Sequence, residues 1–161
     1  MFKKMISMVL TVAMALFCMI FANAASEPHM TVAENGDIVY VYDGFNVVIS
    51  DDPGIQSRAI RSGVATMDEP GEYRLSFGTN RYTYATIEIE NVDDEAGMVF
   101  TISGTVNNEP VEIEVTNLKA GDLRNVSFKA TNNTTLSGSV DTVIEPYRAD
   151  SVEYKYTSNR S

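Results

Sequence analysis

The amino-acid sequence predicts an all-β protein, an antiparallel β-sandwich of the immunoglobulin-like or jelly-roll-like kind, preceded by a signal-peptide helix. Apolar and polar residues alternate at a period of two in many short segments after Ala25, which is typical of strands with one buried face. Turn-forming Gly, Pro, Asn and Asp residues separate these segments. After the first 24 residues, no window of about 11 residues keeps a helical apolar period.

The first 24 residues are interpreted as a secretory signal peptide. Lys3 and Lys4 give a positive start, and a charge-free apolar run of 18 residues extends from Met5 to Ala22. Ala22-Asn23-Ala24 places small residues where a signal peptidase reads them, so we expect cleavage between Ala24 and Ala25. The alternative is an uncleaved membrane anchor, because the run approaches the ~20 residues that a spanning helix needs. The intact cleavage motif favours removal of the signal peptide over its retention as an anchor.

The remaining chain, residues 25–161, suits one β-sandwich domain with short disordered ends. Its 137 residues are enough for a single hydrophobic core. The one cysteine, Cys18, lies in the signal, so the domain has neither disulfides nor thiol chemistry. A cysteine-free exported chain with a Lys-Lys start is typical of a Gram-positive bacterium. We therefore predict a bacterial protein that is secreted or associated with the cell surface, with no membrane span after cleavage.

The exported part is strongly acidic. The sequence holds 12 basic and 22 acidic residues, and removal of the two signal lysines leaves a net charge of −12. Such a charge repels phosphate groups, so nucleic acid and anionic membrane surfaces are unfavourable partners. It also keeps a protein soluble outside the cell, which is the simpler reason for the composition.

The first predicted strands form a hairpin. Residues 37–43 and 45–50 are rich in β-branched and aromatic residues, and Asp43-Gly44 between them is a turn signal. Asp51-Asp52-Pro53-Gly54 ends the hairpin, because proline presets φ and glycine accepts positive φ. Residues 55–62 have no clear pattern, and we expect a short helical turn or an irregular crossover there.

Further strands follow at regular intervals along the chain. About nine or ten strands at this spacing are typical of sandwiches and barrels. The alternating segments are residues 73–77, 82–90, 98–102, 111–115, 126–130 and 152–156. The expected core consists of Val47, Ile49, Tyr73, Leu75, Phe77, Ile87, Ile89, Phe100, Ile102, Ile113, Val115, Val126, Phe128 and Val140.

Residues 67–73, Met-Asp-Glu-Pro-Gly-Glu-Tyr, resemble the Pro-Gly-x-Tyr entry to a late strand in fibronectin type III and bacterial immunoglobulin-like domains. The resemblance implies a sandwich and no activity. It also implies that the Tyr73 hydroxyl bonds to a backbone group near residues 66–69 and locks the corner. The Cys-Trp-Cys core of immunoglobulin domains is absent, since the sequence has no Trp. Residues 71–74 and 121–124 have similar sequences. The similarity indicates either a turn sequence that commonly recurs or a duplicated hairpin, as in jelly rolls.

Residues suited to catalysis or metal binding are scarce. The single histidine, His29, lies near the exported N-terminus, where chain ends are usually disordered. A zinc or copper site therefore lacks a sufficient set of His and Cys ligands. A Ser–His or Cys–His nucleophile pair would have to use this one histidine. Residues 91–95 and Asp51-Asp52 offer oxygens for calcium, but neither matches a calcium-binding loop, and we expect solvated turns. We predict no catalytic residue, no cofactor and no metal.

Tyr82 and Tyr84 are the candidate partner-binding residues. In the strand 82–90 they lie on the face opposite Ala85 and Ile87, among polar neighbours. Such a pair can stack on a sugar or contact a protein, although cross-strand packing is the explanation that we favour. The predicted function is a secreted or surface-associated, non-catalytic β-sandwich module that binds a protein or glycan partner. The alternative is a small extracellular hydrolase or inhibitor, since catalysis by carboxylates alone remains chemically possible.

Overall fold

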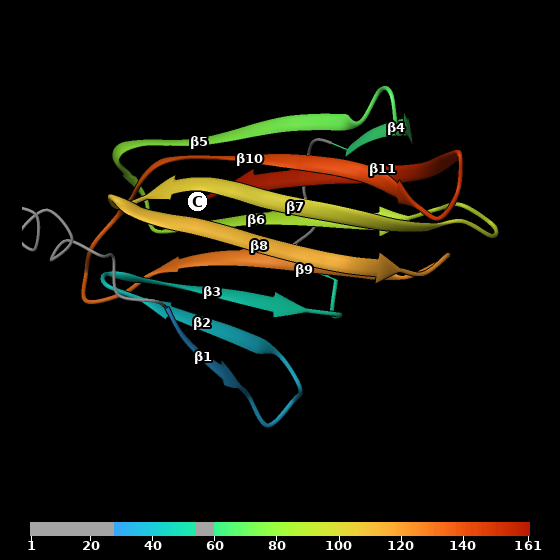
Figure 1. The fold of residues 1–161 in the computed structure, drawn as a ribbon. Coiled ribbons are helices and arrows are strands. Elements are labelled where there is room, and N and C mark those ends of the chain that lie inside the picture. Colours follow the sequence, from blue (N-terminus) through green and yellow to red (C-terminus); the bar gives the residue numbers. More distant parts are fainter. Residues whose placement is uncertain (1–27, 54–59) are drawn as a thin grey trace, which may run out of the picture.

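The fold consists of two antiparallel sheets packed face to face (Figure 1), which confirms the all-β prediction. The computed structural model describes residues 28–53 and 60–161, and the expected signal peptide lies outside them. The strands of the described residues are β1 (His29–Val32), β2 (Ile38–Tyr42), β3 (Phe45–Ser50), β4 (Ile60–Thr66), β5 (Gly71–Tyr82), β6 (Tyr84–Asn91), β7 (Gly97–Val106), β8 (Glu109–Leu118), β9 (Leu123–Ala130), β10 (Leu136–Tyr147) and β11 (Ser151–Arg160).

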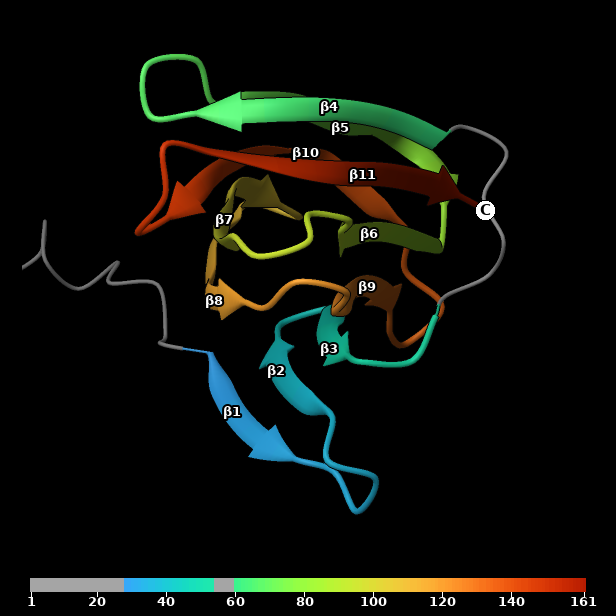
Figure 2. The ribbon, with the colours of Figure 1, turned by 90° about the vertical axis from the view of Figure 1, so that its right-hand side faces the viewer.

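The two sheets differ in size. The larger sheet has seven strands in the order β1-β2-β3-β9-β6-β11-β4, and the smaller has four in the order β5-β10-β7-β8. Every neighbouring pair is antiparallel. Figure 2 shows that the smaller sheet lies beside β9, β6, β11 and β4, whereas β1 and β2 extend past it. The larger sheet therefore has strands at one side with no counterpart in the smaller one.

The last eight strands pair in a nested way. β7 pairs with β8, β6 with β9, β5 with β10, and β4 with β11. The chain thus follows one long hairpin whose turn is Asn107-Asn108, where both residues have positive φ as a tight hairpin turn requires. β1, β2 and β3 join this arrangement through the pairing of β3 with β9.

The hydrophobic core fills the space between the sheets. Of the residues expected there, all are buried except Tyr73 and Val115, which are partly buried and pack against the core. Phe77 of β5 and Phe128 of β9 meet across the sheets with ring centroids 5.4 Å apart. Each such ring stabilises the fold by about 1.5–3 kcal/mol through burial. The alternation in the sequence therefore located the core correctly.

Two segments differ from the sequence-based expectation. Residues 60–62, expected to be helical or irregular, begin β4, while residues 54–59 lie outside the described residues. β4 is an edge strand in which only Ala65 is buried, so it needs no regular apolar alternation. His29, expected in a disordered end, is the first residue of β1, although its side chain is exposed.

The corner before β5 is closed differently from the way the fibronectin resemblance implied. Thr66 and Glu69 close the turn themselves: the Thr66 amide donates to the Glu69 carbonyl at 3.0 Å, and the Glu69 amide donates to Thr66 Oγ1 at 2.9 Å. The Tyr73 hydroxyl instead lies 3.0 Å from the Tyr154 hydroxyl. The expected bond from Tyr73 to the backbone is therefore wrong, because β11 beside β4 brings Tyr154 within reach.

Candidate functional site

The structure separates Tyr82 and Tyr84, the two tyrosines expected on one strand. Tyr82 ends β5 in the smaller sheet, and Tyr84 begins β6 in the larger sheet. Thr83 between them forms the corner, where its amide donates to the Ser161 carbonyl oxygen at 3.0 Å. The expected single strand over 82–90 is therefore wrong in its first two residues, and the two rings do not share one sheet face.

Both rings are engaged by cations of the chain itself. The guanidinium groups of Arg81 and Arg160 lie 5.7 and 5.2 Å from the Tyr82 ring centroid. The Lys129 ammonium lies 5.9 Å from the ring of Tyr84. The hydroxyl of Tyr84 is 3.1 Å from Ser127 Oγ. Because these cations already use the ring faces, the arrangement suits packing within the protein better than stacking on a sugar.

The acidic loop 91–95 is a hydrogen-bonded turn. Asp93 Oδ1 accepts the amides of Ala96 at 2.8 Å and Glu95 at 3.0 Å, and Oδ2 accepts the amide of Glu153 at 3.1 Å. These backbone donors, that of Ala96 first, hold the pKa of Asp93 below its usual value. The side chain of Asn91 donates to the carbonyls of Ala96 and Leu118. The loop oxygens therefore have structural partners.

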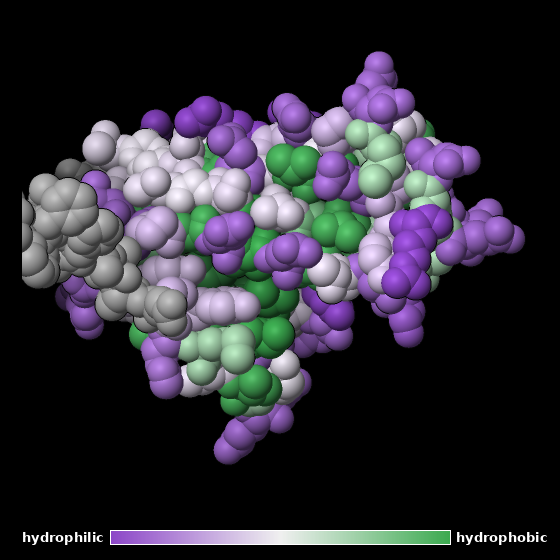
Figure 3. All heavy atoms as spheres, viewed as in Figure 1, coloured by the Kyte–Doolittle hydropathy of each residue, from purple (hydrophilic) through white to green (hydrophobic). Residues whose placement is uncertain are grey.

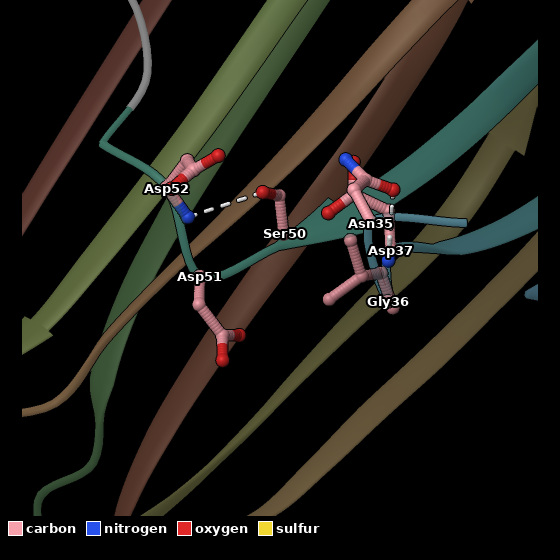
Figure 4. Close-up of a pocket in the computed structure, with 7 residues that line it drawn as sticks. Asn35, Gly36, Asp37, Ser50, Asp51 and Asp52 are labelled. Carbon is pink, nitrogen blue, oxygen red and sulfur yellow. Dashed lines mark hydrogen bonds between the residues drawn. The ribbon is translucent and has the colours of Figure 1, made fainter. Parts of the chain in front are cut away.

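Asp51 and Asp52, the second acidic stretch, line a small pocket of about 140 Å³ between the turn before β2 and the end of β3. Asn35, Gly36 and Asp37 line the same pocket (Figure 4). Asp51 pairs with Arg124, and the amide of Asp52 donates to Ser50 Oγ. In Figure 4 the carboxylates of Asp51 and Asp52 point in different directions. In the described ranges, no group of three or more His, Cys, Asp or Glu side chains is arranged to hold a metal ion.

The feature that distinguishes this sandwich is an apolar surface on β1 and β2. Met30 pairs with Tyr40, and Val32 pairs with Ile38. Tyr40 and Ile38 in turn pair with Val47 and Ile49 of β3, which belong to the core. Directly opposite residues share a sheet face, so all four side chains continue the inner face of the larger sheet. We call Met30, Val32, Ile38 and Tyr40 the apolar ledge.

Burial decreases steadily outward along this face. Val47 on β3 is fully buried, Tyr40 on β2 is partly buried, and Met30 and Val32 on β1 are 57% and 66% exposed. The side chains of β1 are exposed because the two sheets are unequal in size. The smaller sheet ends at β8 and has no further described strand to cover β1. Figure 3 shows hydrophobic surface in its lower part, over the region of β1 and β2.

The ledge lies next to the open edge of β8. β8 pairs with β7 on one side and with no described strand on the other. Val111 and Ile113 point into the core, whereas Glu112 and Glu114 are exposed on the outer face. Burial, then Tyr40, then the charge of Glu109 at the start of β8 raise the pKa of Tyr42 on β2. In Figure 2 the ledge strands β1 and β2 continue the larger sheet beyond this edge.

Sequence reasoning missed this surface. β1 is only four residues long, so its alternation is too short to stand out. The inner-face residues of β2, Ile38 and Tyr40, are apolar as ordinary core residues are, so the local pattern did not mark them as accessible to a partner.

Comparisons with known proteins leave the function open. No family model matches the chain, and no curated protein matches it. Among solved structures, it is similar to Drosophila melanogaster CENP-C bound to CAL1, at 11% identity, 96% coverage of this chain, 98% of that chain and a TM-score of 0.28. The Drosophila melanogaster CENP-C cupin domain gives 11% identity, 86% and 82% coverage and a TM-score of 0.26. Likenesses this weak carry no argument about activity or partners.

Within residues 28–53 and 60–161, no helix is long and apolar enough to cross a membrane.

Proposed function

We propose that this chain is an exported, non-catalytic β-sandwich module that binds a protein partner outside the cytoplasm. The apolar ledge is the observation that carries the proposal. Large exposed apolar groups on a soluble protein, continuous with its core and rimmed by charge, are typical of protein interaction sites. Met30 and Val32 have this character, with Glu34 and Asp37 in the turn beside them.

Export and fold type belong to the same proposal. The positive start, apolar run and Ala22-Asn23-Ala24 motif support secretion or a place at the cell surface of a bacterium. Of the two sandwich types that the sequence left open, the nested pairing of β4 to β11 supports the jelly-roll-like arrangement. The acidic composition supports a partner other than nucleic acid.

A protein partner is favoured over a glycan. Sugar-binding surfaces rely on accessible aromatic faces, and the rings of Tyr82 and Tyr84 already contact cations of the chain. The ledge offers mainly aliphatic and thioether groups, and such groups suit the apolar centre of a protein interface.

The test is a capture experiment with the chain from Ala25 onward, immobilised and exposed to surface and secreted proteins of the producing cells. We expect one partner to be retained by the native protein and lost with Met30→Asp plus Val32→Asp. The matched control is Ile60→Asp plus Val64→Asp, which places the same charges on exposed apolar positions of the opposite edge strand, β4. The control should retain the partner.

Two results would count against the proposal. The first is capture that survives the ledge substitutions. The second is robust turnover in an unbiased panel of hydrolase substrates, abolished by replacing individual carboxylates with amides.

A further inference from the structure

We propose that the open edge of β8 accepts an extended strand of the partner as a fifth strand of the smaller sheet. The strand would alternate basic residues, facing outward, with apolar residues that cover the ledge. This inference rests on the proposed function, because it specifies how the same surface binds a protein. It goes further by fixing the conformation and the chemistry of the bound segment.

The backbone of β8 is suited to this pairing. The Asn107-Asn108 turn is closed by the pair Val106 and Glu109, and hydrogen-bonded and non-hydrogen-bonded pairs then alternate along the hairpin. Glu112 and Glu114 fall on positions whose amides and carbonyls face away from β7. These groups are therefore available to an added strand, as in other cases of peptide binding by strand addition.

The inner side of such a strand would meet the ledge. A fifth strand would lie roughly 4.8 Å beyond β8, and packed sheets are separated by roughly 10 Å. Figure 2 shows β3, β2 and β1 continuing the larger sheet past β8, and β1 and β2 carry the ledge. Apolar side chains at alternate positions of the added strand would therefore remove Met30 and Val32 from water, which is favourable.

The outer side of the strand should be basic. Glu109, Glu112 and Glu114 lie on β8, and the sequences of β1, β2, β3 and β8 contain no Lys or Arg. Residues directly opposite each other in an antiparallel pair share a face. The partner residues opposite Glu112 and Glu114 would thus point outward beside carboxylates, where Lys or Arg is favoured and Asp or Glu is not.

A second copy of the chain is a poor occupant of this edge. Antiparallel pairing of two β8 strands around Ile113 would set Glu112 of one copy opposite Glu114 of the other, and like charges in that position are destabilising. Charges of this kind also protect edges from unwanted pairing. Protection alone, however, gives no reason for the exposed apolar side chains of Met30 and Val32 beside the edge.

The experiment uses ¹⁵N-labelled protein from Ala25 onward and a synthetic peptide of about nine residues that alternates Lys and Val. We expect saturable binding at peptide concentrations up to about 1 mM. Hydrogen exchange of the Glu112 and Glu114 amides should slow by about tenfold or more. The same peptide with Glu in place of Lys should bind at least about tenfold more weakly.

Backbone methylation separates strand addition from mere apolar contact. Lysines opposite Glu112 and Glu114 would occupy hydrogen-bonded pairs, so methylating the lysine amides removes the hydrogen bonds that they donate to the Glu112 and Glu114 carbonyls and places methyl groups against β8. Methylating the valine amides leaves those bonds in place and is the matched control. We expect the first peptide to lose binding and the second to keep it.

A charge exchange tests the partner chemistry from the protein side. Glu112→Lys plus Glu114→Lys should reverse the preference, so that the Glu–Val peptide binds more tightly than the Lys–Val peptide. Glu72→Lys lies on β5, the other edge of the same sheet, and should leave the preference unchanged.

Each contrary result has a distinct meaning. Absence of Lys–Val peptide binding, or binding without protection of the β8 amides, overturns strand addition, while partner capture through the ledge would still support the proposed function. Protection of Glu112 and Glu114 before any peptide is added also overturns it, because the edge would then be occupied by the protein itself. Loss of partner capture in the native protein would instead contradict the proposed function.

Discussion

The hydroxyl of Tyr73 on β5 lies 3.0 Å from the hydroxyl of Tyr154 on β11, and this contact joins the smaller sheet to the larger one. The Tyr73 ring also stacks on Tyr156 with centroids 4.0 Å apart, and the Arg61 guanidinium lies 5.7 Å from its centroid. Three tyrosines from two sheets thus form one cluster beside the β4–β5 corner. The cluster replaces the tyrosine corner that the fibronectin resemblance implied.

The hydroxyl pair should contribute measurably to stability. Tyr154→Phe and Tyr73→Phe each keep the rings and remove one hydroxyl, so we expect each to lower the free energy of unfolding by about 0.5–1.5 kcal/mol. Since both substitutions remove the same bond, the double variant should lose less than the sum of the two. Urea unfolding of all four proteins measures this coupling, and strictly additive losses would show that the hydroxyls do not interact.

Tyr154 should also make the stability of the fold sensitive to high pH. Burial, then the hydrogen bond with Tyr73, raises the pKa of Tyr154 above its ordinary value of 10.0. A raised pKa favours the neutral form in the folded state, so stability is retained below about pH 10 and lost as the pH rises further. Tyr154→Phe should lose less stability between about pH 9 and pH 11 than the native protein. Parallel curves for the two proteins would contradict this assignment.

Gly63 and Gly71 make room for the Tyr154 side chain. A Cβ atom at either position would lie less than 3.0 Å from the Tyr154 hydroxyl and ring. Gly→Ala in a strand is ordinarily favourable, but crowding of this kind costs about 1–3 kcal/mol. We expect Gly71→Ala to be destabilising by that amount in thermal or urea unfolding. In a Tyr154→Phe background the loss should be smaller, since the hydroxyl is the nearest atom; an unchanged loss would point to backbone strain instead.

The Asp93 carboxylate should stabilise the fold at neutral pH and lose this effect in acid. Backbone amides lower its pKa, so its stabilising effect is present above the ordinary value near 3.8 and is lost as the pH falls below it. Asp93→Asn should therefore be less stable than the native protein at about pH 7, with the difference shrinking toward about pH 2–3. Asp94→Asn, in the same exposed loop, is the control and should show little change at either pH.

Tyr82 and Tyr84 should affect stability more than partner binding. Tyr82→Ala and Tyr84→Ala each remove a half-buried ring and its cation contact, and we expect losses of about 0.5–3 kcal/mol in urea unfolding. Capture of the protein partner should remain at the native level. Native stability with lost capture would return these residues to the binding site that the sequence suggested.

The sequence predicted the core because burial on one sheet face leaves a local pattern. Val47 and Ile49, or Ile87 and Ile89, alternate with polar residues whatever strand lies beside them. It did not predict the change of sheet at Thr83, because the alternation continues through that corner. Nor did it predict the contact of Tyr154 with Tyr73, since that depends on which strands become neighbours across 81 residues of chain.

The ledge was beyond local pattern for a similar reason. Ile38 and Tyr40 are apolar in the sequence, as core residues would be. Their exposure to a partner depends on how many strands each sheet contains, which is a property of the whole topology. The acidic character of β8, by contrast, was visible in the sequence but acquires meaning only when β8 is known to be an edge.

The nested pairing also bears on how the chain folds. The β7–β8 hairpin closes through the two residues Asn107-Asn108, and each further pair, from β6 with β9 to β4 with β11, encloses a longer loop. Loop closure becomes entropically costlier with length, so we expect the hairpin to form first and the outer pairs to add in succession. Weakening β4 against β11 should then speed unfolding while leaving the folding rate almost unchanged, whereas a poorer turn at Asn107-Asn108 should slow folding itself.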